Sequence, residues 1–245
     1  MKVKSSLLWG AAAAAVLLAA VAGFVLGRYY IDNKKANFSE DYVLYVYPDM
    51  TPEQIADSLQ AGAGTVRPKS LLRAFDKVDL KANMKPGRYV VSPSSTSIYV
   101  ARMIAFGWQT PQNMTLSGTL RNKGTIARKI GVQMMVDSAE VADALNDKEF
   151  LSQYGFTPED VFGMILPDTY QMYWTASVKE IFDRFKKEYD AFWTPERLAK
   201  ADAQGLTRKE VSIMASIVSG ETRKEFEYPV IAGVYLNRYK TGMKL

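Results

Sequence analysis

The sequence contains neither cysteine nor histidine among its 245 residues. Without cysteine, the chain has no thiol nucleophile, zinc–thiolate site or disulfide. Without histidine, it lacks the usual general base near neutral pH, the Ser-His-Asp and Cys-His arrangements and the commonest metal ligand. No Ser-x-x-Lys sequence occurs either, which argues against a serine–lysine peptidase. An enzyme of this composition must therefore use Asp, Glu, Lys, Tyr or a hydroxyl group.

The chain also has little net charge outside its N-terminus. The total is +5, and residues 1–35 carry +4 of it, so the remaining 26 basic and 25 acidic residues almost balance. A nucleic-acid-binding surface needs a surplus of basic residues on the folded part. We therefore exclude nucleic acid as a partner.

A long hydrophobic run lies near the N-terminus. Leu7 to Leu26 contains 20 uncharged residues, and at about 1.5 Å rise per residue this length matches a hydrocarbon core of roughly 30 Å. Arg28, Tyr29 and Tyr30 follow, a cation and two phenols typical of a membrane interface. A cleaved signal peptide is the alternative, because Ala20-Val21-Ala22 fits a small-x-small cleavage site.

Both interpretations place the rest of the chain outside the cytoplasm. We expect a cytoplasmic N-terminus at residues 1–6, a transmembrane helix at 7–26 and a linker at 27–41. The basic residues flanking the apolar run nearly balance, so charge counting favours neither orientation strongly.

The next segment has the pattern of a small α+β module. The signals are a β-branched and aromatic run, two helix starts, an amphipathic run and a short strand after a Pro-Gly turn. The aromatic run is at 42–47, and the helix starts are at Thr51-Pro52 and at Thr96 or Ser97. The amphipathic run is at 71–78, and the short strand is at 89–91. Such a module is either an adaptor or a ligand-binding domain, and the pattern does not separate the two.

The following part begins as a second unit of similar kind. Ile126, Ala127 and Ile130 repeat the helical spacing seen near Ile55. Residues 177–192 form an amphipathic helix whose apolar face is core. Between them, "GMILPDTYQMYW" (163–174) surrounds a predicted turn with aromatic residues, which suits either a sugar-binding cleft or a buried turn.

The stretch "SIVSGETRKE" ends a predicted helix on an acid. Thr207 with Glu210 three residues later forms a capping box, and the helix that follows is apolar over most of its circumference. We expect it to be buried. Desolvation and the negative helix end would then raise the pKa of Glu221, as a general acid requires. The alternative is a surface ion pair of Glu221 with Arg223 or Lys224.

A further apolar helix at 230–236 ends in Asn237 and Arg238. A carboxamide and a guanidinium at this position are either substrate contacts or C-terminal capping groups.

Three motifs together resemble the endolytic murein transglycosylases of the MltG, or YceG-like, family. They are "LPDTY" (166–170), "SIVSGET" (216–222) and "YLNRYKTGMKL" (235–245), behind one transmembrane helix and a LysM-like module. The resemblance implies a LysM-like α+β module at 42–115 and a mainly helical α+β catalytic domain at 116–245. It assigns the catalytic glutamate to Glu221, and Asp168, Tyr170, Asn237 and Arg238 become candidate substrate contacts.

The resemblance also implies the reaction. Such enzymes cut the MurNAc–GlcNAc β-1,4 bond inside nascent peptidoglycan strands and leave 1,6-anhydro-MurNAc ends. The muramic C6 hydroxyl is an internal nucleophile, so one glutamate replaces the two carboxylates of ordinary glycosidases. No cofactor, metal or histidine is required.

The expected location is the bacterial inner membrane, with the bulk of the chain on the periplasmic side. The expected partners are glycan strands and cell-wall synthases. The alternative function is a non-catalytic glycan-binding scaffold of the synthesis machinery. The family sequence continues past "GMKL" with Asp-Pro-Thr, whereas this chain stops at Leu245, so we expect an incomplete catalytic domain. Ser219 and Gly220 also stand where the family has charged residues.

Overall fold

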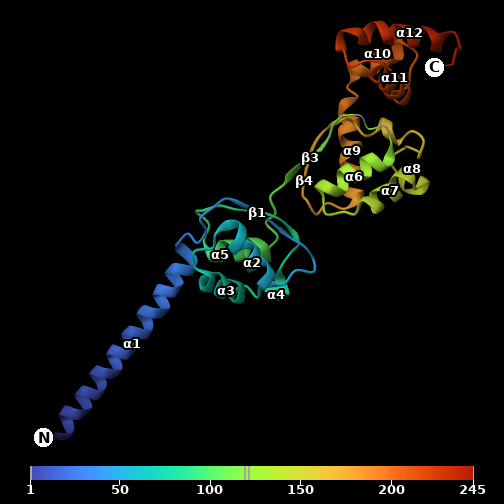
Figure 1. The fold of residues 1–245 in the computed structure, drawn as a ribbon. Coiled ribbons are helices and arrows are strands. Elements are labelled where there is room, and N and C mark those ends of the chain that lie inside the picture. The colour runs from blue at the N-terminus through green and yellow to red at the C-terminus, as the bar shows by residue number, and fades with distance from the viewer. Residues whose placement is uncertain (1, 119, 121, 245) are drawn as a thin grey trace. The chain divides into compact units, whose positions relative to one another are not determined.

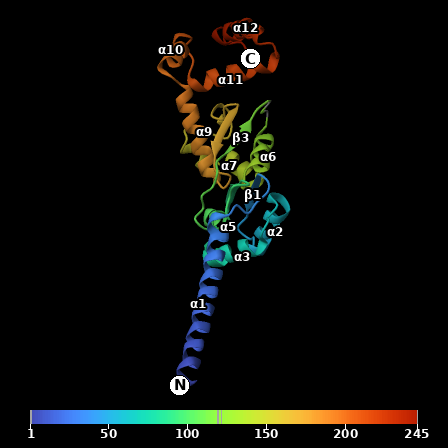
Figure 2. The same cartoon turned by 90° about the vertical axis from the view of Figure 1, so that its left-hand side faces the viewer.

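The structure, a computed structural model, describes residues 2–118, 120 and 122–244. The last residue of the third motif, Leu245, lies outside this range. The chain divides into two compact units, Met1–Gln112 with Tyr173–Thr175, and Asn113–Met172 with Ala176–Leu245. Each contains helices and one two-stranded sheet (Figures 1 and 2). The predicted α+β class is confirmed.

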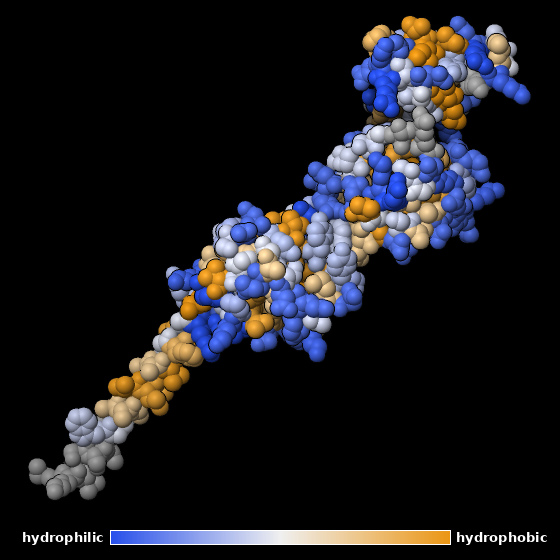
Figure 3. All heavy atoms as spheres, viewed as in Figure 1, coloured by the Kyte–Doolittle hydropathy of each residue, from blue (hydrophilic) through white to orange (hydrophobic). Residues whose placement is uncertain are grey.

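Helix α1 (Lys2–Lys34) is longer than the sequence pattern indicated. Its segment Ala12–Lys34 is long and apolar enough to cross a membrane. Large apolar side chains are exposed along it, for example Leu17 and Leu18 (Figure 3).

Helix α1 continues through Lys34, into the predicted linker at 27–41, and contacts α3 and α5 of the first unit. Asp32 accepts hydrogen bonds from Ser70 Oγ at 2.6 Å and from Arg73 Nη2 at 2.5 Å. Beyond the helix, Asn37 is fully buried and bonds to Ser97 Oγ at 2.9 Å. Residues 27–41 are therefore part of the first unit and not a free connection.

The first unit follows the predicted module closely. Its elements are β1 (Tyr42–Val46), α2 (Pro52–Ala63), α3 (Pro68–Lys77), α4 (Leu80–Asn83), β2 (Gly87–Val91) and α5 (Ser97–Ala105). β1 and β2 are antiparallel, with Leu44 opposite Tyr89, and both of these side chains are fully buried. Thr51 caps α2 in a complete capping box, and Thr96 caps α5. Local capping and turn signals fix most of these boundaries.

The second unit repeats the order of strand, helices, strand and helix before it adds further helices. Its elements are β3 (Gln112–Leu116), α6 (Lys123–Gln133), α7 (Ser138–Asn146), α8 (Lys148–Ser152), the 3₁₀ turn η1 (Val161–Gly163), β4 (Asp168–Met172), α9 (Val178–Phe192), α10 (Pro195–Ala203), α11 (Arg208–Glu221), the 3₁₀ turn η2 (Glu225–Glu227) and α12 (Tyr228–Lys240). β3 pairs with β4, two strands that the sequence pattern did not predict.

The predicted turn at Pro167–Thr169 is wrong, because Asp168 begins β4. The strand alternates as a half-buried strand does, with Tyr170 inward and its neighbours exposed. The aromatic residues expected to line a sugar cleft are mostly packed: Trp174 is 4% exposed and its ring meets those of Tyr45 and Tyr47 edge-on at 4.9 Å. Tyr170 and Trp174 are therefore buried, as the alternative to a sugar-binding cleft predicted, whereas Tyr173 is 52% exposed.

Helix α9 carries the core of the second unit. Ser177 caps it in a complete capping box, and its inward face is buried, as its amphipathic pattern predicts. This face consists of Ile181, Phe182, Phe185 and Tyr189.

Candidate active site

Helix α11 begins where its capping box predicts. Thr207 Oγ1 accepts the backbone N–H of Glu210, and a Glu210 oxygen accepts the backbone N–H of Thr207 at 2.7 Å. Two contacts attach the first turns to the rest of the unit. Lys209 pairs with Asp160 at 2.5 Å, and Ser212 Oγ donates to the carbonyl of Gly163 at 3.4 Å. The start of α11 is therefore held against η1.

The expectation that α11 is buried is wrong. Met214 and Val218 are buried, but Ile213 is 49% exposed and Ala215 is also exposed. Apolar residues surround the helix, yet its main neighbours are only η1, α10 and α12, with one ion pair from Arg208 to α9. Desolvation at the end of this helix is correspondingly small.

Glu221 is the last residue of α11, and its side chain is exposed. Its Oε1 accepts a hydrogen bond of 2.8 Å from the hydroxyl of Tyr235 on α12. Its Oε2 has no hydrogen-bond partner within the described part of the chain. One carboxylate oxygen is thus fixed, and the other is free to meet a ligand.

The predicted ion pair of Glu221 with Arg223 or Lys224 is absent among residues 2–118, 120 and 122–244. Lys224 instead lies 3.5 Å from Glu227. Thr222 Oγ1 donates to Glu227 at 2.6 Å and accepts the N–H of Lys224. These bonds close the turn between α11 and α12, and Lys224 pairs there with Glu227 instead of Glu221.

Two tyrosines on α12 connect the helices, and we call their bonds to α11 the tyrosine clasps. Tyr235 donates to Glu221, and Tyr239, one turn later, donates to Glu210 Oε1 at 2.6 Å. The accepted hydrogen bond from Tyr239, with those from Thr207, lowers the pKa of Glu210 to about 2. The clasps therefore join both ends of α11 to one face of α12.

The structure gives Arg238 a local partner. Its Nη2 donates to the carbonyl of Lys244, and its guanidinium carbon lies 5.8 Å from the centre of the Tyr235 ring. Arg238 therefore makes a C-terminal capping contact, which was the alternative to substrate contact. Asn237 is exposed on α12, and its backbone carbonyl accepts from Thr241. Substrate contact by Asn237 or Arg238 stays a prediction.

Asp168 and Tyr170 lie on β4, which pairs with β3. Asp168 is exposed, whereas the ring of Tyr170 is 1% exposed and its hydroxyl donates to the carbonyl of Leu166 at 2.6 Å. Burial is the main cause of the raised pKa of Tyr170. Tyr170 is thus a core residue here and not a surface contact. In the part of the chain that is described, no hydrogen bond or ion pair joins either residue to Glu221.

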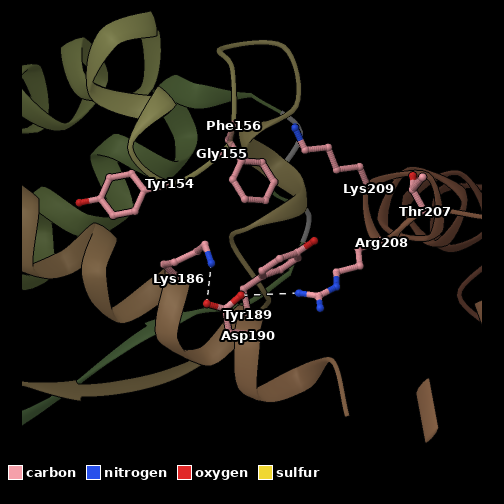
Figure 4. A pocket seen from close by; sticks show the side chains of 9 residues that line it. All are labelled: Tyr154, Gly155, Phe156, Lys186, Tyr189, Asp190, Thr207, Arg208 and Lys209. Carbon is pink, nitrogen blue, oxygen red and sulfur yellow. Dashed lines mark hydrogen bonds and ion pairs between the residues drawn. The ribbon is translucent and has the colours of Figure 1, made fainter. Parts of the chain in front are cut away.

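A shallow cavity of about 390 Å³ lies elsewhere, between α9 and the start of α11 (Figure 4). Asp190 pairs with Lys186, one turn earlier on α9, at 2.5 Å, and with Arg208 of α11 at 3.8 Å. Its third cation, Lys209, pairs with Asp160. The cavity contains none of the predicted site residues, and each of its cations already has a carboxylate partner.

The residue that sequence reasoning did not single out is Tyr235. It stands at the start of the motif "YLNRYKTGMKL", but a tyrosine in an apolar helix normally indicates packing. Its partner is 14 residues away in sequence, so only the geometry of the helical hairpin identifies it.

Comparison with known proteins gives two findings. The model of the YceG-like family matches residues 44–245. A crystal structure of a protein described as yceG-like, from Listeria monocytogenes, superposes with a TM-score of 0.50 at 20% sequence identity, covering 84% of this chain and 72% of that one. No curated protein matches the sequence.

Proposed function

The chain belongs to the YceG-like family, and we propose that it is a lytic transglycosylase that cleaves MurNAc–GlcNAc bonds inside peptidoglycan strands. A cell-wall function is what family membership supports. The finer assignment depends on one observation, the exposed Glu221 with one fixed and one free oxygen at the end of α11.

The proposed reaction needs one acid that later becomes a base. Protonated Glu221 gives its proton to the glycosidic oxygen as the bond from muramic C1 to that oxygen breaks. The muramic C6 hydroxyl then bonds to C1 and releases its proton to Glu221. The acid is regenerated, no water is consumed, and the new strand end is a 1,6-anhydro sugar.

A long polymeric substrate fits an exposed acid better than an enclosed one. Glu221 is exposed and lies beside exposed Ser219 and Gly220. A glycan strand that extends in both directions from the cut bond requires such an open approach. We propose further that α1 spans the inner membrane and that both units lie on its periplasmic side.

The test compares the full chain with Glu221→Gln on purified peptidoglycan. Glutamine keeps the size of the side chain but cannot donate or take the proton, so release of anhydro-ended fragments should fall by at least about 100-fold. The fragments are counted by mass spectrometry after chromatography. Glu225→Gln is the matched control, since Glu225 is a nearby exposed glutamate in η2.

Equal release by the wild type and Glu221→Gln would sink the proposal. Binding of glycan strands by the wild type without any new anhydro ends would instead support the scaffold alternative.

A further inference from the structure

Tyr235 is the residue that fixes the orientation of the Glu221 side chain. The hydroxyl of Tyr235 lies 2.8 Å from Glu221 Oε1. Of the two neighbouring cations, Lys224 is engaged by Glu227, and Arg223 makes no ion pair with Glu221 within the described residues. We propose that Tyr235 is a positioning residue that holds Oε1 and thereby directs Oε2 to the glycosidic oxygen. This inference rests on the proposed function.

A carboxylate at an exposed helix end has three rotatable bonds and no packing to restrict them. A catalytic acid works only within hydrogen-bond reach of the oxygen that it protonates. In the described residues Tyr235 makes the one side-chain hydrogen bond to Glu221, so loss of that bond frees the carboxylate to rotate.

The same bond selects the oxygen that carries the proton. A phenol donates to Oε1 when Glu221 is ionised, and it can still donate to Oε1 as the carbonyl oxygen of the neutral acid. The transferable proton then sits on Oε2. The phenol thus keeps its role in both halves of the reaction.

The electrostatics keep Tyr235 a donor. The hydrogen bond to Glu221, then desolvation and the charge of Glu221, raise the pKa of Tyr235, while the charge of Arg238 on the same helix opposes them. Tyr235 therefore stays protonated wherever the wall is at neutral pH.

The second tyrosine clasp provides a matched control. Tyr239 is on the same helix, one turn further, and also donates to a glutamate of α11. Its partner, Glu210, belongs to the capping box and not to the proposed chemistry. If the clasps only fasten α12 to α11, removal of either hydroxyl has the same effect.

The activity experiment uses the full chain with Tyr235→Phe and Tyr239→Phe on peptidoglycan strands. We expect Tyr235→Phe to lower kcat about 10- to 100-fold with little change in KM, because a misplaced acid slows the chemical step. Tyr239→Phe should stay within about 2-fold of the wild type. Thermal unfolding of both variants checks that each is folded. Equal losses of kcat, or an unchanged kcat in Tyr235→Phe, would overturn the inference.

A second measurement does not depend on activity. Tyrosine labelled with ¹³C at Cζ reports the titration of each phenol by NMR. In Glu221→Gln the pKa of Tyr235 should fall, and that of Tyr239 should not. An identical pKa of Tyr235 in the wild type and in Glu221→Gln would show that the hydrogen bond between Tyr235 and Glu221 does not form in solution. Full activity of Glu221→Gln would remove the proposed function, whereas an inactive Glu221→Gln beside an unaffected Tyr235→Phe removes the positioning role alone.

Discussion

Helices α9 and α11 begin in the same way and end in different environments. Each starts with a complete capping box, Ser177 with Glu180 and Thr207 with Glu210. The apolar residues of α9 lie on one face, and that face is buried. Those of α11 surround the helix, and only Met214 and Val218 are buried.

The difference shows that apolar content and burial are separate properties. An amphipathic helix specifies which side faces the core, because its charged side cannot. The sequence of a helix that is apolar on all sides does not specify which side faces the core. Its burial depends on how many other elements pack against it. In α11 the neighbours are few, and the exposed end carries the candidate acid.

The largest expected effect is the difference in stability cost between truncating a side chain on α9 and truncating one on α11. Phe185 is fully buried on α9 and meets the Tyr170 ring at 4.9 Å. Phe185→Ala should lower the free energy of unfolding of the second unit by about 3–5 kcal/mol. Ile213→Ala on α11 should cost less than about 1 kcal/mol, because half of that side chain is already exposed. Denaturant-dependent hydrogen exchange of α9 amides measures both, and similar costs would break the comparison.

A smaller effect is expected from the two caps. Ser177→Ala and Thr207→Ala each remove a side-chain acceptor, at a cost of about 1 kcal/mol. For α9 the loss should appear throughout the second unit, since this helix carries its core. For α11 we expect faster hydrogen exchange in the first turn only.

Thr207→Ser is the control for the cap, because it keeps the accepting oxygen. Accelerated exchange across all of α9 in Thr207→Ala would mean that α11 is as strongly coupled to the core as α9 is.

The smallest effect concerns pH. The pKa of Glu210 is lowered from 4.5 to about 2, first by the hydrogen bond from Tyr239 and then by those from Thr207. A lowered folded-state pKa gives stability that is present above 4.5 and is lost as the pH falls toward 2. The pKa of Glu180 in the α9 box is also lowered, mainly by the backbone N–H of Ser177.

Tyr239→Phe separates the two boxes. It should raise the pKa of Glu210 and leave that of Glu180 unchanged, as measured by ¹³C NMR titration of the carboxyl carbons. A Glu210 titration that is insensitive to Tyr239 would show that the second tyrosine clasp does not form in solution.

The sequence predicts those parts of the fold whose causes are local. Capping residues and their partners lie three residues apart, so Thr51, Thr96 and Thr207 mark helix starts without knowledge of the rest. Strands β3 and β4 cannot be predicted from such local signals. Their pairing joins Thr115 to Thr169, residues 54 apart in sequence, and neither strand has a strong pattern of its own.

The site shows the same division. Glu221 is recognisable through its motif, and the start of its helix follows from the capping box. Its exposure and its partner do not, because both depend on how α12 folds back along α11. The candidate contacts differ in the same way: Asp168 and Tyr170 are two residues apart in the motif "LPDTY", but Tyr170 is in the core and Asp168 is exposed.

Helix α1 has a mechanical consequence for the first unit. It runs unbroken to Lys34, and Asp32 is held by Ser70 and Arg73 of α3. A rotation of α1 about its own axis must therefore carry the first unit with it. If the apolar stretch ends near Leu26 at the membrane surface, the remaining turns raise the first unit by about 12 Å. If α1 spans a membrane, as we propose, it is a rigid mount that fixes the height and the facing direction of the first unit, whereas a flexible tether would leave both free.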